Sequence, residues 1–239
     1  PDESLMINTS PVRDFLICFG SKPYNPIDFN PAFDPLLIRW SDQENPYEWV
    51  PALTNQSGEI RITNGSTIVT AVSTRQEIVV FTDTAIYSMQ YVGPPFVWSV
   101  NLLDQDISIA SQNAIASINN TVYWMGTDKF FVYNGRVDTL PCTIRQHIFS
   151  NLNQDQIAQV TCGNNEAFSE VWWFYPSTSS QENDLYVVYN YEQRVWYYGA
   201  MPRTAWADRN VLGFPIAISP DGYVYYQESG LNDNSADPP

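Results

Sequence analysis

The chain has 239 residues, of which 44% are hydrophobic and 15% aromatic, and its formal net charge is −15. A chain of this size and composition can bury one large core, which excludes a disordered tail or linker. The chain has 26 acidic and 11 basic residues. This acidic balance disfavours sequence-specific binding to DNA, because affinity for phosphates depends on lysine and arginine. No apolar run approaches the roughly 20 residues that cross a bilayer, so we expect no membrane-spanning segment.

Short apolar segments recur along the chain at intervals of roughly 40 to 60 residues, and turn residues and aromatic strands follow most of them. This period predicts an all-β fold, a β-propeller of four-stranded antiparallel blades. A β-sandwich remains the alternative, because the spacing is irregular and the segments match by residue class only. The apolar segments are 15–18, 68–72, 115–118, 157–160 and 216–219, and the strands expected after them are 77–81, 85–92, 121–125, 129–133, 170–175, 184–191 and 223–227.

Turn signals agree with a sheet built from hairpins. Asn134-Gly135 and Asp221-Gly222 tolerate positive φ beside aromatic runs, whereas Asn119-Asn120 and Thr127-Asp128 are weaker signals. Helical periodicity is nearly absent, and only residues 144–153 and the stretch around 155 are expected to be helical.

Seventeen prolines exclude long helices and mark irregular connections on a rim. They gather in Pro23–Pro35, in Pro46–Pro51 and at Gly93–Pro95. We expect one propeller domain over residues 14–229, with 1–13 and 230–239 as extensions or fragment ends. If the chain is a segment of a longer polypeptide, the propeller can be incomplete within it.

Catalytic arrangements are poorly supported by the sequence. His147 is the only histidine, and its surroundings contain no nucleophile elbow. A pair of carboxylates could hydrolyse a glycan on a propeller rim, but 26 acidic residues make such candidates common. We therefore predict no catalytic residue and no enzymatic activity. The carboxylates available to such a site are Asp83, Asp128, Glu166, Glu170 and Asp221.

Metal and cofactor motifs are also missing from the sequence. Cys18, Cys142 and Cys162 have no metal-ligand spacing, and we interpret them as small apolar residues in preference to a disulfide or metal site. Residues 151–155 and 232–234 could offer oxygen ligands to calcium, but they lack the glycine and terminal glutamate of an EF-hand and are better explained as polar turns. We predict no metal site, no cofactor-binding residue and no cofactor.

Two aromatic clusters and one loop are the candidate interaction surfaces. The clusters, Trp172–Tyr175 and Val195–Tyr198, are expected to pack between blades, with a subunit interface as the alternative. The proline-rich segment Pro23–Pro51 mixes charge with large apolar anchors, as interfaces do, although a loop packed on its own blade explains it equally well. The candidate interface residues are Trp40, Asp42, Glu44, Trp49, Trp172, Trp173, Trp196 and Tyr197.

Several segments resemble the β-propeller tail proteins of short-tailed bacteriophages, the nozzle or hub subunits below the portal. The segments are Asp34–Pro46, Thr74–Asp83, Tyr123–Asp128 and Tyr189–Tyr197. The resemblance covers most of residues 14–229 but contains no catalytic motif, so no functional residue transfers to a numbered position.

The resemblance implies a structural virion protein, assembled in the host cytoplasm, whose copies form a ring of about six around the tail axis. Its other partners would be tail proteins such as an adaptor and fibres. DNA would pass through the ring without sequence-specific binding, and an acidic lumen would repel its phosphates. The alternatives are a glycan-binding or glycan-hydrolysing propeller of a phage or bacterial surface protein and, third, a bacterial adhesion module.

Overall fold

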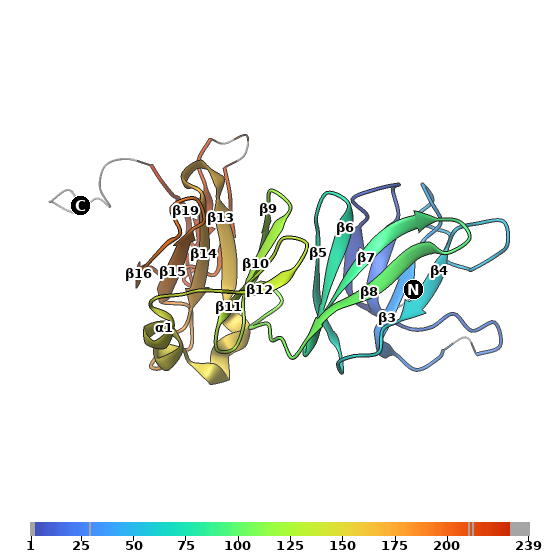
Figure 1. Ribbon diagram of the computed structural model, residues 1–239, viewed down its shortest axis with the longest axis horizontal. Coiled ribbons are helices and arrows are strands. Elements are labelled where there is room, and N and C mark those ends of the chain that lie inside the picture. Colours follow the sequence, from blue (N-terminus) through green and yellow to red (C-terminus); the bar gives the residue numbers. More distant parts are fainter. Residues whose placement is uncertain (1–2, 29, 210, 212, 230–239) are drawn as a thin grey trace, which may run out of the picture. The chain divides into compact units, whose positions relative to one another are not determined.

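The computed structural model describes residues 3–28, 30–209, 211 and 213–229. Within these residues the chain forms five antiparallel sheets, four of them with four strands and one with three. Consecutive strands are neighbours in every sheet, which confirms the expected all-β fold of four-stranded antiparallel sheets (Figure 1).

The described residues divide into two compact units, and the predicted domain 14–229 includes residues of both. Unit 1 extends to Gln112 and also includes Asn119–Val122 and Val132–Asp138, and unit 2 contains the remainder. The predicted extension 230–239 lies outside the described residues, as does the candidate calcium segment 232–234.

The first sheet of unit 1 has the order β1–β2–β3–β4. Its first strand lies within the predicted extension 1–13 and pairs antiparallel with the second, with Met6 opposite Phe19. The sequence did not indicate this strand because its outward residues Leu5 and Ile7 are apolar and exposed, the reverse of the usual alternation. The strands are β1 (Ser4–Thr9), β2 (Leu16–Ser21), β3 (Asp34–Trp40) and β4 (Gly58–Arg61).

The second sheet of unit 1 has the order β5–β6–β7–β8 and confirms the strands expected at 68–72, 77–81 and 85–92. β5 contacts β1 and β2, and the two sheets share one core that includes Phe15, Ile38, Val80 and Trp98. β7 and β8 form a long hairpin that turns at Pro94–Pro95 (Figure 1). The strands are β5 (Ile68–Ser73), β6 (Glu77–Thr82), β7 (Ala85–Gly93) and β8 (Val97–Gln105).

The third sheet, β12–β11–β10–β9, confirms the strands expected at 115–118, 121–125 and 129–133. Its turns also follow the sequence signals, because Asn119 and Asn120 both have positive φ and Gly135 has a φ of 101°. The strands are β9 (Ile115–Ile118), β10 (Thr121–Met125), β11 (Phe130–Tyr133) and β12 (Val137–Leu140).

Two short helices precede the fourth sheet and correct one predicted strand. The expected helix over 144–153 is α1 (Arg145–Asn151), and the expected helical stretch around 155 is the 3-10 helix η1 (Gln154–Gln159). The apolar segment 157–160 therefore does not begin a sheet. Asn153 caps η1 by accepting a hydrogen bond from the Asp155 backbone N–H. This cap favours a helical turn at a place where the apolar pattern predicted a strand.

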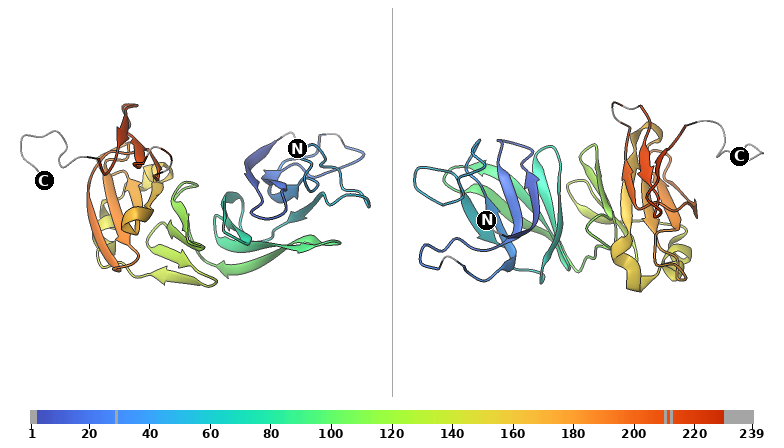
Figure 2. Two further views of the ribbon diagram at one scale, coloured as in Figure 1. Left: turned by 90° about the horizontal axis from the view of Figure 1, so that it is seen from above. Right: turned by 180° about the vertical axis from the view of Figure 1, so that it is seen from behind.

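The fourth sheet has the order β13–β14–β15–β16 and confirms the strands expected at 170–175 and 184–191 (Figure 2). β13 contacts β9 and the first strand of the last sheet, β17. The 3-10 helix η2 (Glu166–Phe168) joins its first two strands. The strands are β13 (Thr161–Asn165), β14 (Glu170–Tyr175), β15 (Leu185–Asn190) and β16 (Val195–Ala200).

The last sheet has three described strands, β17 (Ala205–Ala207), β18 (Ile216–Ile218) and β19 (Val224–Tyr226). The predicted apolar segment 216–219 forms its middle strand, not its first. Gly222, with a φ of 85°, makes the expected turn into β19. No helix among the described residues is long and apolar enough to cross a membrane.

Candidate functional site

The predicted rim segment 23–51 consists of two loops separated by a buried strand. Residues 22–33 connect β2 to β3, residues 41–57 connect β3 to β4, and β3 itself lies in the core. Trp40, the last residue of β3, is 5% exposed, and its indole N–H donates to the Gln56 carbonyl at 2.8 Å. Trp40 therefore anchors the second loop from inside, and its predicted interface role does not fit this burial.

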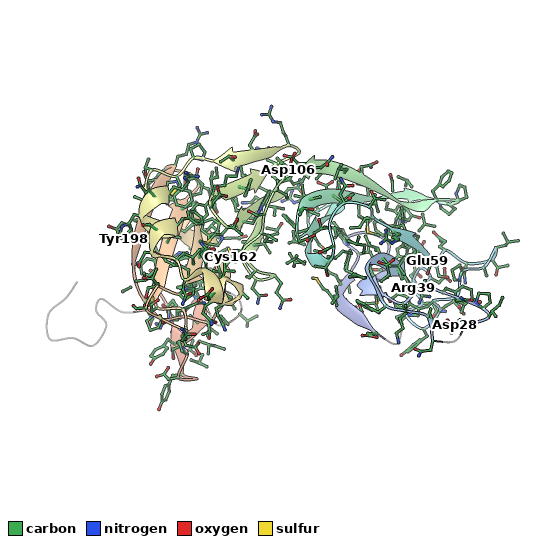
Figure 3. The ribbon with its side chains drawn as sticks, turned by 90° about the horizontal axis from the view of Figure 1, so that it is seen from below. Asp28, Arg39, Glu59, Asp106, Cys162 and Tyr198 are labelled. Carbon is green, nitrogen blue, oxygen red and sulfur yellow. The ribbon has the colours of Figure 1, made fainter. Side chains whose placement is uncertain are left out.

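Arg39 ties both loops to the sheet. Its guanidinium donates to the carbonyl of Lys22 at the start of the first loop and to that of Trp49 in the second loop, both at 3.0 Å. Its Nε lies 3.3 Å from Oε2 of Glu59 on β4, and the same carboxylate oxygen accepts the Tyr24 backbone N–H at 2.8 Å. Figure 3 shows Arg39 and Glu59 side by side at the base of these loops. Because Arg39 is only 6% exposed, its hydrogen bonds and its ion pair with Glu59 support both loops rigidly.

The second loop has its own hydrogen-bond framework, which contains three of the predicted interface residues. Half-buried Asp42 accepts the Gln56 backbone N–H at 2.7 Å, and exposed Glu44 donates its backbone N–H to the Asp14 carbonyl at 3.0 Å. The half-buried indole of Trp49 donates to the Pro46 carbonyl at 2.7 Å. These residues hold the loop in one conformation while parts of Glu44 and Trp49 remain accessible.

Several large apolar side chains on these two loops are exposed. Ile27 is 88% exposed, Tyr47 92% and Leu53 fully exposed. Exposed apolar side chains on loops that are hydrogen-bonded to the sheet are candidates for contact with a partner. We call the set the rim-loop surface; it comprises Tyr24, Ile27, Tyr47, Val50 and Leu53.

The first aromatic cluster of unit 2, Trp172–Tyr175, is buried within the chain, as the favoured interpretation expected, whereas Val195, Tyr197 and Tyr198 of the second cluster are exposed. Trp172 is 8% and Trp173 0% exposed, which leaves neither available to another subunit. The rings of Trp172 and Trp206 stack with centroids 5.4 Å apart, and half-buried Trp196 stacks on Trp173 at 6.0 Å. Tyr197 is 37% exposed and is the most accessible of the predicted residues in these clusters.

Tyr197 belongs to a hydrogen-bonded group around a buried carboxylate. Its hydroxyl donates to Glu170, which also accepts the Trp172 indole N–H at 2.9 Å. Burial, together with the hydrogen bond to the charged Glu170 carboxylate, raises the pKa of Tyr197 well above its usual value. The hydroxyl therefore remains a proton donor to Glu170 across the physiological pH range.

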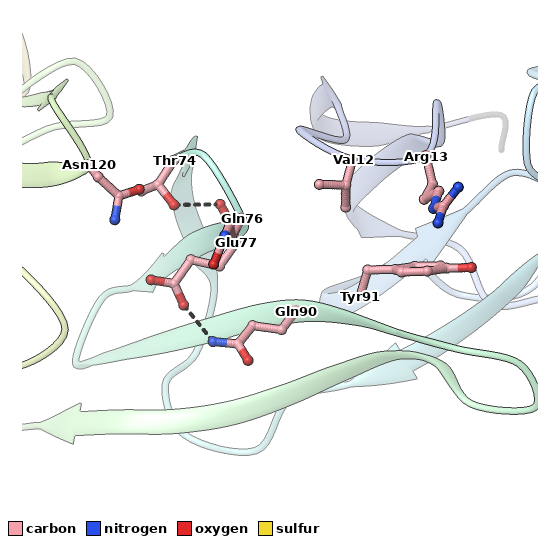
Figure 4. Close-up of a pocket in the computed structure, with 8 residues that line it drawn as sticks. All are labelled: Val12, Arg13, Thr74, Gln76, Glu77, Gln90, Tyr91 and Asn120. Carbon is pink, nitrogen blue, oxygen red and sulfur yellow. Dashed lines mark hydrogen bonds between the residues drawn. The ribbon is translucent and has the colours of Figure 1, made fainter.

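A polar pocket in unit 1 was not indicated by the sequence. It has a volume of about 410 Å³ and lies near the start of β6 (Figure 4). The only available signal was Glu77, an acidic residue that opens an otherwise apolar strand. The lining residues are Val12, Arg13, Thr74, Gln76, Glu77, Gln90, Tyr91 and Asn120.

Glu77 is the buried acid of this pocket, with 9% of its surface exposed. One carboxylate oxygen accepts the Tyr133 hydroxyl at 2.8 Å, and the other accepts the Gln90 amide at 2.9 Å and the Ser88 hydroxyl. Burial raises the pKa of Glu77, but these three hydrogen bonds to the charged form outweigh burial and leave the pKa below its usual value. The pocket therefore contains a fixed negative charge at neutral pH.

Besides Glu170, three of the carboxylates that the sequence offered for catalysis have structural partners. Asp83 accepts the Ser66 backbone N–H at 2.8 Å, Asp128 pairs with Arg145 at 3.7 Å, and Asp221 accepts the Ser219 hydroxyl in the β18–β19 turn. Glu166 begins η2 and is exposed.

The three cysteines are free, and Cys18 is buried in the first sheet, where burial raises the pKa of its thiol. Among the described residues, no cluster of His, Cys, Asp and Glu has the arrangement of a metal site. Asn153, from the candidate calcium segment 151–155, donates its side-chain amide to the Ser180 carbonyl at 2.8 Å.

No family model matches this chain, and no curated protein matches it. Among solved structures, an extracellular domain from B. thetaiotaomicron is 12% identical, with a TM-score of 0.51 over 93% of this chain and 32% of that one. This chain thus spans about a third of that structure's length, and at such identity the likeness shows a shared fold alone.

Two further structures are similar at lower scores. Hsv2 from Kluyveromyces lactis is 13% identical, with a TM-score of 0.48 over 92% of this chain and 72% of that one. The N-terminal domain of Nup159 is 9% identical, with a TM-score of 0.45 over 95% of this chain and 55% of that one. These scores carry no argument about function.

Proposed function

We propose that this protein is a structural subunit of a short bacteriophage tail, a nozzle or hub component that assembles with copies of itself into a ring. The rim-loop surface is the observation that carries the proposal. Its apolar side chains are exposed, yet the loops that bear them are fixed by buried Arg39. A preformed apolar surface binds a partner with a small loss of conformational entropy, as permanent assemblies require.

The sheet arrangement supports the propeller part of the proposal. In unit 1 the first strand of the second sheet, β5, contacts the first strand of the preceding sheet, β1. In unit 2, β13 contacts the first strands β9 and β17 in the same way. Sheets that adjoin through their first strands are the arrangement expected of propeller blades, in which first strands lie nearest the axis.

The charge of the chain supports a role as a conduit for DNA. A net charge of −15 repels phosphates, and at physiological salt this repulsion extends over about 8 Å. A channel through which a genome leaves must not hold it. We therefore propose that acidic side chains face the lumen of the ring and that DNA passes without sequence-specific binding.

Assembly tests the proposal. The mass of the purified protein in solution, alone and with its tail partners, is measured by light scattering. We expect a discrete ring in one of the two samples, and a Leu53→Asp variant should assemble more weakly because it replaces a fully exposed apolar side chain of the rim-loop surface with a charge. A stable monomer in both samples would overturn the proposal.

Val211→Asp is the matched control for this experiment. Val211 and Leu53 are both fully exposed apolar residues, so neither substitution disturbs a core. Val211 lies in unit 2, outside the rim-loop surface. Equal loss of assembly in the two variants would show a general effect of added charge and would remove the rim loops from the interface.

The second candidate function is glycan binding on a phage or bacterial surface protein. The polar pocket beside Glu77 favours it, since hydroxyl-rich ligands need both hydrogen-bond donors and acceptors. A pair of carboxylates opposed across a water-filled cleft would be needed for glycan hydrolysis. Of the pocket-lining residues, only Glu77 is acidic, which favours binding over hydrolysis.

A further inference from the structure

The polar pocket of unit 1 is framed by a rigid turn and two strands. In the β5–β6 turn, the Thr74 backbone N–H and hydroxyl both donate to the Glu77 carbonyl, at 2.9 and 3.0 Å. This double contact fixes Gln76 at the tip of the turn. Gln90 lies directly opposite Glu77 on β7, and Tyr91 follows it. The pocket is therefore a preformed feature of the second sheet.

The pocket offers donors and acceptors in similar measure. Gln90 uses its amide N–H on Glu77, which leaves its carbonyl oxygen as an acceptor. Asn120 leaves the opposite group available. Its side-chain carbonyl oxygen accepts the Arg75 backbone N–H at 3.0 Å, so its side-chain NH₂ remains as a donor. Gln76 is exposed and can supply either group.

The charges of the pocket oppose each other. Arg13 contributes one positive charge and Glu77 one negative charge, so the lining has no net charge that would favour a charged ligand of either sign. In the view of Figure 4, Arg13 is drawn on the same side of the pocket as Tyr91, and Glu77 on the side of Thr74 and Asn120. Three of the acceptor positions on Glu77 are already occupied, so it has little remaining capacity for an ammonium group.

An aromatic ring completes the lining. Tyr91 is half-buried, and its ring is held edge to face against Trp98 with centroids 5.6 Å apart. Such a ring gives apolar contact area to a ligand whose edges are polar, and Val12 adds a second apolar contact. A pyranose has this character, because its C–H groups pack on a ring while each hydroxyl donates and accepts at once.

We propose that this pocket binds a neutral saccharide of one or two units. Its volume of about 410 Å³ is in the range of small-molecule sites and limits the ligand to this size. The proposal does not depend on ring assembly, since every lining residue belongs to unit 1. A glycan of the host surface and a free sugar share this chemistry.

Ligand-observed NMR and isothermal calorimetry on the full chain test the proposal. The neutral probes are N-acetylglucosamine, lactose and maltose, and the charged comparators are sialic acid and lysine. We expect one or more neutral probes to bind in the millimolar range and the comparators to bind more weakly. A polymeric host glycan presented on beads separates a surface ligand from a free sugar, because only the former would retain the protein.

Substitutions locate the binding. The Gln76→Ala, Asn120→Ala double variant removes two exposed pocket amides and should weaken the affinity about tenfold, as expected for the loss of two hydrogen bonds. Arg13→Ala should weaken it by a smaller factor. Arg136→Ala is the control for Arg13→Ala, because Arg136 is also exposed but pairs with Asp138 outside the pocket.

Three results would overturn the proposal. The first is no binding of any neutral probe up to its solubility limit, and the second is binding that the double variant leaves unchanged. The third is preference for sialic acid or lysine over all neutral probes. None of these results bears on assembly, so the saccharide site and the ring can fail independently.

Discussion

Arg39 is the residue on which the rim-loop surface depends most. Arg39→Met keeps most of the buried aliphatic stem but removes two hydrogen bonds to loop carbonyls and the contact with Glu59. A hydrogen bond to a charged group contributes about 1.5–3 kcal/mol, which gives about 3–6 kcal/mol for two. The loop carbonyls can regain water after the change, so we expect a loss of about 3 kcal/mol in the free energy of unfolding.

Urea unfolding followed by circular dichroism measures this loss, and hydrogen exchange locates it. Amide exchange should accelerate in both loops, 22–33 and 41–57, because both lose their shared support. Arg136→Met is the control: Arg136 is 81% exposed, and its pair with Asp138 should contribute no more than about 0.5 kcal/mol. The reasoning is refuted if Arg39→Met changes stability no more than the control does, or if only one loop responds.

Three further predictions concern the sheets. Gly163→Ala should destabilise unit 2 by about 1–3 kcal/mol in urea unfolding, because the new Cβ would clash with the Trp206 ring; an unchanged midpoint would contradict this packing. Glu77→Gln should lose about 1–3 kcal/mol at neutral pH, since its three hydrogen-bond donors no longer meet a charged acceptor. The pKa of Glu77 is lower in the folded state than its usual 4.5, so the difference from wild type should shrink as pH falls below 4.5, and a constant difference in acid unfolding curves would disprove the assignment. Burial, together with Asp184 and Tyr198, raises the pKa of Tyr175 to about 12, so its contribution to stability is present below pH 10 and lost as pH rises through about 12. Tyr175→Phe should therefore shift alkaline unfolding to higher pH, as measured by tyrosinate absorption and circular dichroism, and an identical transition in both proteins would count against this.

The central strands of the sheets were predictable because their signals are local. Residues 121–125 and 170–175 are aromatic or apolar runs bounded by turn residues, and both form strands with these bounds. Some outer strands were not predictable. β4 consists of Gly58–Arg61, and its pairing depends on β3 across a long loop, so its short polar sequence carries no periodic signal.

The candidate sites were less predictable because their partners are distant in sequence. Arg39 lies in the segment 23–51 that the sequence predicted as a surface loop, yet it is buried because Lys22, Trp49 and Glu59 converge on it from three other segments. The partner of Glu77, Tyr133, is 56 residues away. Single-sequence patterns describe neighbours along the chain, whereas a buried charge is explained only by the groups that surround it in space.

Glu77 and Glu170 occupy the same position in two different sheets, and the apolar pattern of the sequence does not reveal this repeat. Each is the first residue of the second strand of its sheet, and each is 9% exposed. Each lies opposite a carboxamide residue of the third strand, Gln90 or Asn190, and accepts a tyrosine hydroxyl.

This shared position has a physical consequence for how the strands pair. A slip of one residue would move the carboxylate to the opposite face of the sheet, away from its donors, and would leave it buried without compensation. The two glutamates therefore oppose register slippage in strands whose remaining residues are almost uniformly apolar and would pair in several registers. In β6 and β14, one glutamate thus fixes the register of pairing, while the apolar residues provide the stability of the core.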